Sequence, residues 1–254
     1  MTETWSMVLL GLVQGLTEFL PVSSSGHLIL AHDFLQVTEY GLAVDAVLQL
    51  ATVFAVVVYF WRDLVSIVTE RKYALGLALA VGTIPAVIVG VLIEDVMATA
   101  FRSAELVAYT LLLGSLVMLV AEYWTRTIPD KVIGWKEGLV VGLFQCLALV
   151  PGMSRSGMTI SGGMFLGLSR AEAARFGFLL AVPILAGSGA KKLLELATGG
   201  ALATIGAPLA VGFVVAFLSG LAAIYLLLAL VRRTPLTVFV VYRVLLAVVI
   251  LILV

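Results

Sequence analysis

Six long apolar stretches constrain the fold of this chain more than any other feature of its sequence. A helix that crosses the roughly 30 Å hydrocarbon core of a bilayer needs about 20 apolar residues. With 62% hydrophobic and 12% charged residues, the 254-residue chain is too apolar for a soluble domain. We therefore expect an all-α polytopic membrane protein. The six expected spans are residues 42–60, 74–93, 104–122, 173–190, 207–230 and 236–254.

Two pairs of shorter apolar segments are each joined by a break that contains proline, serine and glycine. The pairs are 5–20 with 28–36, and 138–150 with 158–168. These segments are too short to cross a bilayer, so each pair predicts a re-entrant helical hairpin. Irregular backbone at membrane depth is tolerated only where protein or a wet cavity surrounds it. The two breaks are therefore the candidate functional regions.

The two hairpins belong to an internal repeat. Residues 11–29 and 142–160 are identical at eight of nineteen positions at a shift of 131, and residues 79–92 match 209–222 at six of fourteen at a shift of 130. The eight identical pairs are Gly11/Gly142, Leu12/Leu143, Gln14/Gln145, Leu16/Leu147, Ser23/Ser154, Ser25/Ser156, Gly26/Gly157 and Ile29/Ile160.

Each repeat consists of one hairpin followed by three spans. A hairpin returns to the face it started from and three spans cross to the other, so the second repeat begins on the opposite face. We expect a single membrane domain over 1–254 with an inverted-topology repeat, repeat one covering about 5–122 and repeat two about 136–254. The two breaks then face each other near the bilayer midplane, as in many transporters.

Basic residues in the loops orient the chain, because cytoplasmic loops are enriched in Lys and Arg. The face opposite the N-terminus carries Arg62, Arg71, Lys72, Arg126, Lys131, Lys136, Arg170, Arg232 and Arg233. The N-terminal face carries Arg102, Lys191 and Lys192. This asymmetry predicts that both termini lie outside.

The breaks carry the residues that suggest chemistry. Gln14 and Glu18 lie four residues apart and share a helix face just before the first break. Each break opens a new short helix, and a helix N-terminus with free N–H groups attracts anions. Arginine binds phosphate through two parallel hydrogen bonds. The residues that we expect at a phosphate-binding site are Gln14, Ser23, Ser25, Ser154, Arg155, Ser156 and Thr159.

Ionisable groups within membrane segments are costly and point to function. Glu18, His27 and Arg155 are the ones within the broken segments, and Ser24 adds a hydroxyl nucleophile. Ser24 could attack phosphorus while His27 accepts its proton, or His27 could itself be the nucleophile. Glu18 could orient His27, act as the base or hold a divalent cation.

Structural explanations compete with these roles. Ser23, Ser25 and Ser156 also fit helix N-caps, and the repeat mates Gln14 and Gln145 fit interhelical hydrogen bonds. We expect His32 to be solvated near the interface. Asp45 and Arg243 fit either a cavity lining or a structural pairing, and Glu18 could form a purely structural ion pair with Arg155.

Two functions remain open on the chemistry alone. One is an intramembrane phosphate-transfer enzyme, favoured modestly because a nucleophile and a base are both present. The other is a transporter or flippase for an anionic lipid or another phosphate-bearing substrate. A structural subunit would not explain the polar cluster. Fifteen basic and fifteen acidic residues cancel, which gives no indication of a nucleic-acid partner, and one cysteine excludes a disulfide framework.

The segments QGLTEFLPVSSSGH (14–27) and PGMSRSGMT (151–159) closely resemble the undecaprenyl-diphosphate phosphatase family of the bacitracin-resistance type. The resemblance extends along the chain through FQCLALVPG (144–152), LAVP (180–183) and YR (242–243). It implies an enzyme of the bacterial inner membrane that hydrolyses undecaprenyl diphosphate to undecaprenyl phosphate and inorganic phosphate. This reaction recycles the lipid carrier of cell-wall peptidoglycan synthesis and gives bacitracin resistance.

The resemblance also implies a prenyl diphosphate lipid substrate, contact with membrane lipids, an active site toward the outer face and dependence on a divalent cation such as Mg²⁺ or Ca²⁺. It places the glutamate-rich motif on Gln14 and Glu18, the serine and histidine on Ser24 and His27, and the basic motif on Ser154, Arg155, Ser156 and Thr159. Gln14 stands where many relatives have glutamate, so carboxylate roles, including metal binding, fall on Glu18. The sequence leaves open whether the chain forms a homodimer.

Overall fold

The computed structural model describes residues 3–35, 41–93, 103–129 and 131–253, and within these ranges the chain forms eleven helices and no β-strand. The prediction of an all-α chain is confirmed for this part of the sequence. Arg102, which contributes to the orientation argument, lies outside the described residues.

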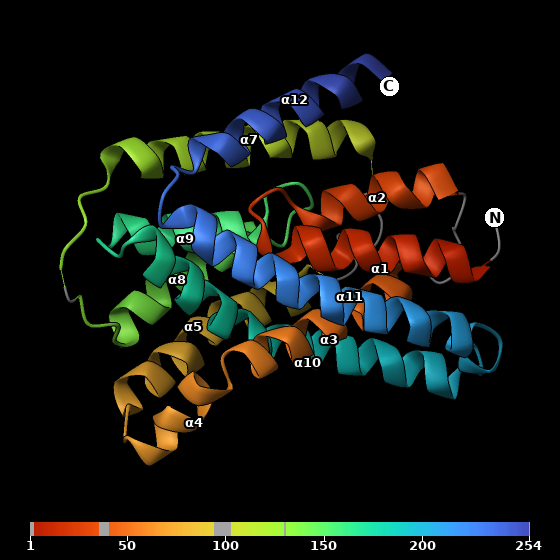
Figure 1. The fold of residues 1–254 in the computed structure, drawn as a ribbon, viewed down its shortest axis with the longest axis horizontal. Helices are drawn as coiled ribbons and strands as arrows, with labels where there is room; N and C mark the ends of the chain where they lie inside the picture. Colours follow the sequence, from red (N-terminus) through yellow and green to blue (C-terminus); the bar gives the residue numbers. More distant parts are fainter. Residues whose placement is uncertain (1–2, 36–40, 94–102, 130, 254) are drawn as a thin grey trace.

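Two helical hairpins occupy the centre of the molecule. The first consists of α1 (Glu3–Phe19) and α2 (Ser24–Leu35), and the second of α8 (Trp135–Leu147) and α9 (Arg155–Phe165). In Figure 1 they enter from opposite ends of the molecule, and their tips meet near its middle.

Longer helices surround the hairpins. Five of them are long and apolar enough to cross a membrane: α3 (Gly41–Tyr59), α5 (Tyr73–Leu92), α7 (Ala104–Trp124), α10 (Arg170–Thr198) and α11 (Leu202–Val231). A sixth, α12 (Thr237–Leu253), is apolar but has only 17 residues. The short helix α4 (Trp61–Thr69) has no counterpart in the sequence-based expectations. Apolar side chains cover the outside of the molecule. In the most apolar 18-residue stretch of α5, only 17% of the residues are buried, as expected for a multi-pass protein that faces lipid.

Close helix contacts are made at glycines. α1 packs against α11, and α8 packs against α5. A Cβ atom on Gly11 would overlap the carbonyl oxygen of Gly212, and one on Gly142 would overlap the carbonyl oxygen of Gly82. Such small residues allow helix backbones to approach closely in membrane proteins.

The two breaks share one backbone conformation. Ser23 and Ser154 precede α2 and α9 with positive φ angles of 75° and 74°, a conformation that costs a non-glycine residue about 1–2 kcal/mol. Each hydroxyl accepts a hydrogen bond from the N–H three residues later, at 3.4 Å from Gly26 and 3.2 Å from Gly157. These bonds cap the new helices and offset part of that cost.

We predict that Gly11→Ala destabilises the protein by about 2 kcal/mol, because the added methyl group must push α1 away from α11. The measurement is thermal unfolding of the purified protein in detergent.

Gly206→Ala on α11 is the matched control, since a Cβ there meets no atom within 4 Å. Its Tm should stay unchanged or rise, because alanine is the better helix former. Equal Tm values for the two variants would contradict the proposed close contact.

Candidate active site

Glu18 is the centre of the polar cluster. It lies in the last turn of α1, and its side chain is only 3% exposed. One carboxylate oxygen, Oε2, accepts hydrogen bonds from Gln14 Nε2 at 2.9 Å and from Ser24 Oγ at 2.6 Å. The chain reverses between α1 and α2, so the hydroxyl at the start of α2 reaches the carboxylate at the end of α1.

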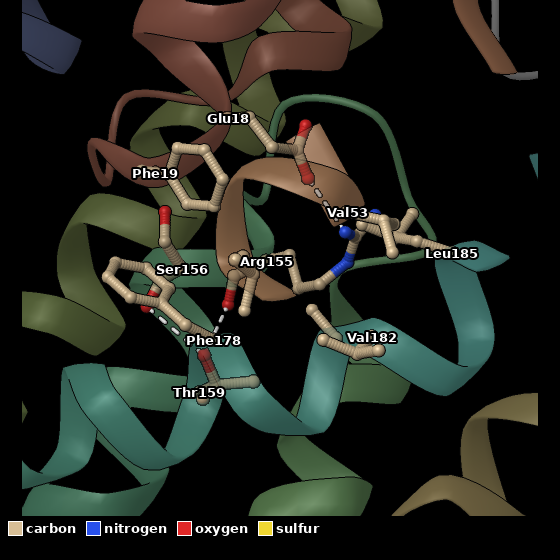
Figure 2. A pocket seen from close by; sticks show the side chains of 12 residues that line it. Glu18, Phe19, Val53, Arg155, Ser156, Thr159, Phe178, Val182 and Leu185 are labelled. Atoms are coloured by element: carbon tan, nitrogen blue, oxygen red, sulfur yellow. Dashed lines mark hydrogen bonds and ion pairs between the residues drawn. The ribbon is translucent and has the colours of Figure 1, made fainter. Parts of the chain in front are cut away.

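Arg155 reaches the same carboxylate from the second hairpin. Its Nη1 donates to Glu18 Oε1 at 2.7 Å, and Figure 2 shows the guanidinium extended toward Glu18 beside Val53, Val182 and Leu185. The buried carboxylate is thus paired with a cation, as burial of a charge requires. The arginine side chain remains 21% exposed, and its other N–H groups are available to a ligand.

The predicted serines form two similar pairs at the breaks. Ser23 and Ser25 lie 3.3 Å apart between hydroxyl oxygens, and their repeat mates Ser154 and Ser156 lie 3.2 Å apart. The cap role expected for Ser23 is confirmed. The hydroxyl of Ser156, also expected to be a cap, instead donates to the Leu20 carbonyl at 3.0 Å and so joins the two hairpins.

Ser25 also departs from the cap expectation. Its hydroxyl lies against that of Ser23, whose own hydroxyl caps the helix. Thr159 lines the same cavity as Glu18 and Arg155, but its hydroxyl donates to backbone carbonyls of its own helix.

The two ring nitrogens of His27 bond groups other than Glu18. Its Nδ1 bonds the Ser23 carbonyl at 2.7 Å, and its Nε2 lies 2.7 Å from the Tyr242 hydroxyl of α12. Because a carbonyl only accepts, Nδ1 carries a proton, and in the neutral ring Nε2 accepts from the Tyr242 hydroxyl. The two rings are also stacked, 5.8 Å apart. In the sequence, Tyr242 stands out only as part of a motif that resembles the family. Its proximity to the site could not be predicted, because it depends on how α12 packs.

Arg243 joins both breaks. It is fully buried, with none of its surface exposed, and α12 directs it between the two hairpin tips. Its guanidinium donates to the carbonyls of Pro21 at 3.4 Å, Gly152 at 2.9 Å and Met153 at 3.2 Å. It also donates at 3.0 Å to Ser115 Oγ and to the Leu111 carbonyl of α7. The structure therefore assigns Arg243 a structural pairing, and its charge stays close to the breaks.

Two further structural expectations are wrong. Gln14 bonds Glu18 within its own helix, and both polar side-chain atoms of Gln145 are buried without a partner among the described residues, so neither expected interhelical bond is found there. The mate of Glu18 in repeat two is Leu149, which offers Gln145 no acceptor. His32 is not solvated: it is buried, and its Nε2 lies 2.7 Å from Asp45 Oδ1, because α2 and α3 enclose it.

The donor set restricts how a divalent cation could bind. Among the residues that the structure describes, no three His, Cys, Asp or Glu side chains are grouped to hold a metal ion. A site made of protein ligands alone therefore does not fit. Mg²⁺ bound to phosphates, however, commonly takes only one or two carboxylates from the protein, and Glu18 fits that requirement.

The cavity beside Glu18 is narrow and largely apolar. Glu18, Phe19, Arg155 and Phe178 line it, with contributions from α3 and α10. Its volume of about 10 Å³ is close to the minimum for a single water molecule. This cavity alone is too small to hold a diphosphate group.

Fold and site together define a class: a polytopic helical membrane protein whose two hairpin tips hold a Ser–Glu–Arg cluster around a buried carboxylate. The family described as bacitracin resistance protein BacA matches residues 7–249. The chain belongs to this family.

Named relatives cover nearly the whole chain. It is 43% identical over 262 residues to an undecaprenyl-diphosphatase of Mycobacterium sp. (strain KMS), with 97% of this chain and 95% of the relative covered. It is 45% identical over 265 residues to an undecaprenyl-diphosphatase of Mycobacterium marinum, with 98% and 94% covered. An undecaprenyl-diphosphatase of Myxococcus xanthus is 42% identical over 265 residues, with 97% and 87% covered.

We predict that Arg243→Lys lowers the free energy of unfolding by about 3 kcal/mol. An ammonium group can donate three hydrogen bonds and cannot reach both breaks at once, and hydrogen bonds to charged groups contribute roughly 1.5–3 kcal/mol each. Thermal or denaturant unfolding in detergent measures the loss.

The exposed Arg233→Lys is the control and should change stability by less than about 0.5 kcal/mol. If Arg243→Lys unfolds like the parent protein, the guanidinium does not hold the breaks together.

Proposed function

We propose that this chain is an undecaprenyl-diphosphatase of the bacterial inner membrane. It hydrolyses undecaprenyl diphosphate to undecaprenyl phosphate and inorganic phosphate, which recycles the carrier lipid of peptidoglycan synthesis and gives bacitracin resistance. The observation that carries the proposal is the 2.6 Å hydrogen bond from Ser24 Oγ to Glu18, with Arg155 on the other carboxylate oxygen. The named relatives, all undecaprenyl-diphosphatases, support the choice of substrate.

In the first step, Ser24 attacks the terminal phosphorus. Glu18 Oε2 takes the hydroxyl proton as Oγ bonds phosphorus, because it already accepts that proton in a hydrogen bond. The bond from phosphorus to the bridging oxygen breaks, and undecaprenyl phosphate leaves with the bonding electrons. Arg155, the N-termini of α2 and α9, and the serine hydroxyls of both breaks stabilise the phosphoryl oxygens.

In the second step, water attacks the phosphoserine. The bond between Oγ and phosphorus breaks, Glu18 returns its proton to Ser24, and inorganic phosphate leaves with the protons of the attacking water. His27 is the competing nucleophile and the second proton-handling group. Its contact with Tyr242 favours Glu18 as the base for Ser24, because a direct transfer requires hydrogen-bond reach.

As an alternative to its role as the base, Glu18 would hold a divalent cation together with the substrate diphosphate. Such an ion supplies positive charge to the phosphoryl oxygens during transfer. Gln14 is neutral and donates to Glu18, so it cannot be a second anionic ligand.

We also propose that the chain crosses the membrane six times and has two re-entrant hairpins, arranged as an inverted repeat with both termini outside. Supporting it, α1 packs on α11 as α8 packs on α5, and the glycines at these contacts are repeat mates. The start of α1 and the end of α12 lie at one end of the molecule in Figure 1. The prenyl tail would lie along the lipid-facing helices.

The transporter or flippase alternative rests on the same inverted repeat. No described contact favours it over catalysis, and a pure transporter has no need of a serine hydroxyl hydrogen-bonded to a buried carboxylate. Phosphate release by detergent-solubilised protein separates the two functions, because catalysis requires no second compartment.

We predict that Ser24→Ala lowers phosphate release from undecaprenyl diphosphate by at least about a thousand-fold, because the nucleophile is lost. The assay uses purified protein in detergent, with Mg²⁺, Ca²⁺ and a chelator in parallel. Chelation should reduce the activity of the parent protein.

Thr17→Val on the same hairpin is the control and should retain activity, since the Thr17 hydroxyl donates only to its own helix, to the Val13 carbonyl. Near-normal release by Ser24→Ala would contradict the serine mechanism and would favour His27 as the nucleophile.

We predict that cysteines replacing Glu3 and Arg71 are labelled from opposite sides of intact cells. The test uses Cys146→Ser as the background, because Cys146 is the one native cysteine. Glu3 begins α1 and Arg71 follows α4, and these positions lie at opposite ends of the molecule. Labelling of both from the same side would contradict the three-span repeat.

A further inference from the structure

A second polar cleft lies at the end of the molecule opposite the start of α1, where α7 and α11 end and α10 begins (Figure 1, left). Its volume is about 280 Å³, far larger than the cavity at Glu18. The polar residues that line it are Glu122, Thr125, Thr127, Ser169, Arg170 and Arg232. None of them belongs to the cluster that we assign to catalysis.

The acidic residue that lines this cleft, Glu122, already has a cation and a backbone N–H as partners. Glu122 forms a two-pronged ion pair with Arg170, and its Oε2 also accepts from the Leu236 backbone N–H at 3.0 Å. Its side chain is 6% exposed. This pairing fixes the ends of α7, α10 and α12 relative to one another and neutralises the one carboxylate of the lining.

Hydrogen-bond donors of the lining are left without partners. Among the described residues, the buried Thr125 hydroxyl has no hydrogen-bond partner. Within the described ranges, exposed Arg232 forms no side-chain hydrogen bond or ion pair. A buried hydroxyl without a partner is costly, and with Arg170 matched by Glu122 the cleft keeps the positive charge of Arg232. These features match an anion that accepts hydrogen bonds.

The cleft lies at the level of an aromatic belt. Tyr123 and Trp124, at the end of α7, are 78% and 81% exposed, and Trp135 at the start of α8 is 50% exposed. Exposed aromatic rings of this kind mark the headgroup level of a bilayer. Basic pockets between helix ends at this level are suited to lipid phosphates.

We propose that this cleft binds a phosphate group through Arg232 and Thr125, independently of the diphosphatase reaction. A lipid headgroup and free inorganic phosphate are the two sources of such a group, and they share the same chemistry of acceptor oxygens and negative charge.

The test measures ligand binding to the delipidated full-length protein in detergent by native mass spectrometry. Phosphatidylglycerol, diacylglycerol and inorganic phosphate serve as probes. Phosphatidylglycerol should bind saturably and diacylglycerol should not, because it lacks the phosphate. If inorganic phosphate binds on its own and displaces phosphatidylglycerol, free phosphate is a ligand of the cleft. If phosphatidylglycerol stays bound in the presence of inorganic phosphate, the lipid headgroup is the ligand.

Arg232→Gln and Thr125→Val should each weaken phosphate binding about ten-fold, as expected for loss of a hydrogen bond to a charged group. Arg233→Gln is the matched control: it removes an equal charge from the next residue, which does not line the cleft, and should change binding less than about two-fold. All three variants should retain phosphate release from undecaprenyl diphosphate. Equal weakening by Arg232→Gln and Arg233→Gln, or equal binding of the two lipids, would overturn the proposal.

Discussion

The buried guanidinium of Arg243 is the interaction on which the central arrangement depends. The breaks of the two hairpins leave backbone carbonyls without helical partners, and in a membrane protein such groups must be satisfied inside the protein. Arg243 donates to carbonyls of both breaks and to α7, so one side chain fixes both hairpin tips. No carboxylate among the described residues pairs with it. Its charge therefore contributes to a positive potential where the phosphates of the proposed substrate would lie.

Residues that are identical in the two repeats have structural roles, and the residues proposed for catalysis differ between the repeats. Identical mates build the same local structure twice, as in the capping serines Ser23 and Ser154. The groups proposed for catalysis stand where the mates differ: Glu18 corresponds to Leu149, and Ser24 corresponds to Arg155. In the proposed mechanism, the two helix starts offer backbone N–H groups to the phosphates from both repeats. The proposed nucleophile and base come from one repeat and the arginine from the other.

Hydropathy and the repeat predict the long helices and the two hairpins. A helix that crosses a bilayer needs an apolar stretch of a set length, and such stretches can be recognised in the sequence. The contact between Glu18 and Arg155 also follows, since facing breaks bring their tips together. The inward direction of Arg243 and Tyr242 could not be predicted in this way, because it depends on how α12 packs against distant helices. The prediction of a solvated His32 is wrong for the same reason, since its partner lies on another helix.

The pairing of Arg155 with Glu18 also explains how a resting site can hold a buried base in its charged form. While the guanidinium lies on Oε1, the carboxylate is stabilised as an anion, and Ser24 stays hydrogen-bonded to Oε2. In the proposed mechanism, an entering diphosphate competes for Arg155 with more negative charge and more acceptor oxygens than one carboxylate offers. As the arginine turns toward the phosphate, Glu18 loses its counter-charge in a narrow, largely apolar cavity, where an unpaired carboxylate is costly. Accepting the Ser24 proton removes that cost, so binding of the substrate prepares Glu18 to act as a base at the moment when the serine is needed as a nucleophile.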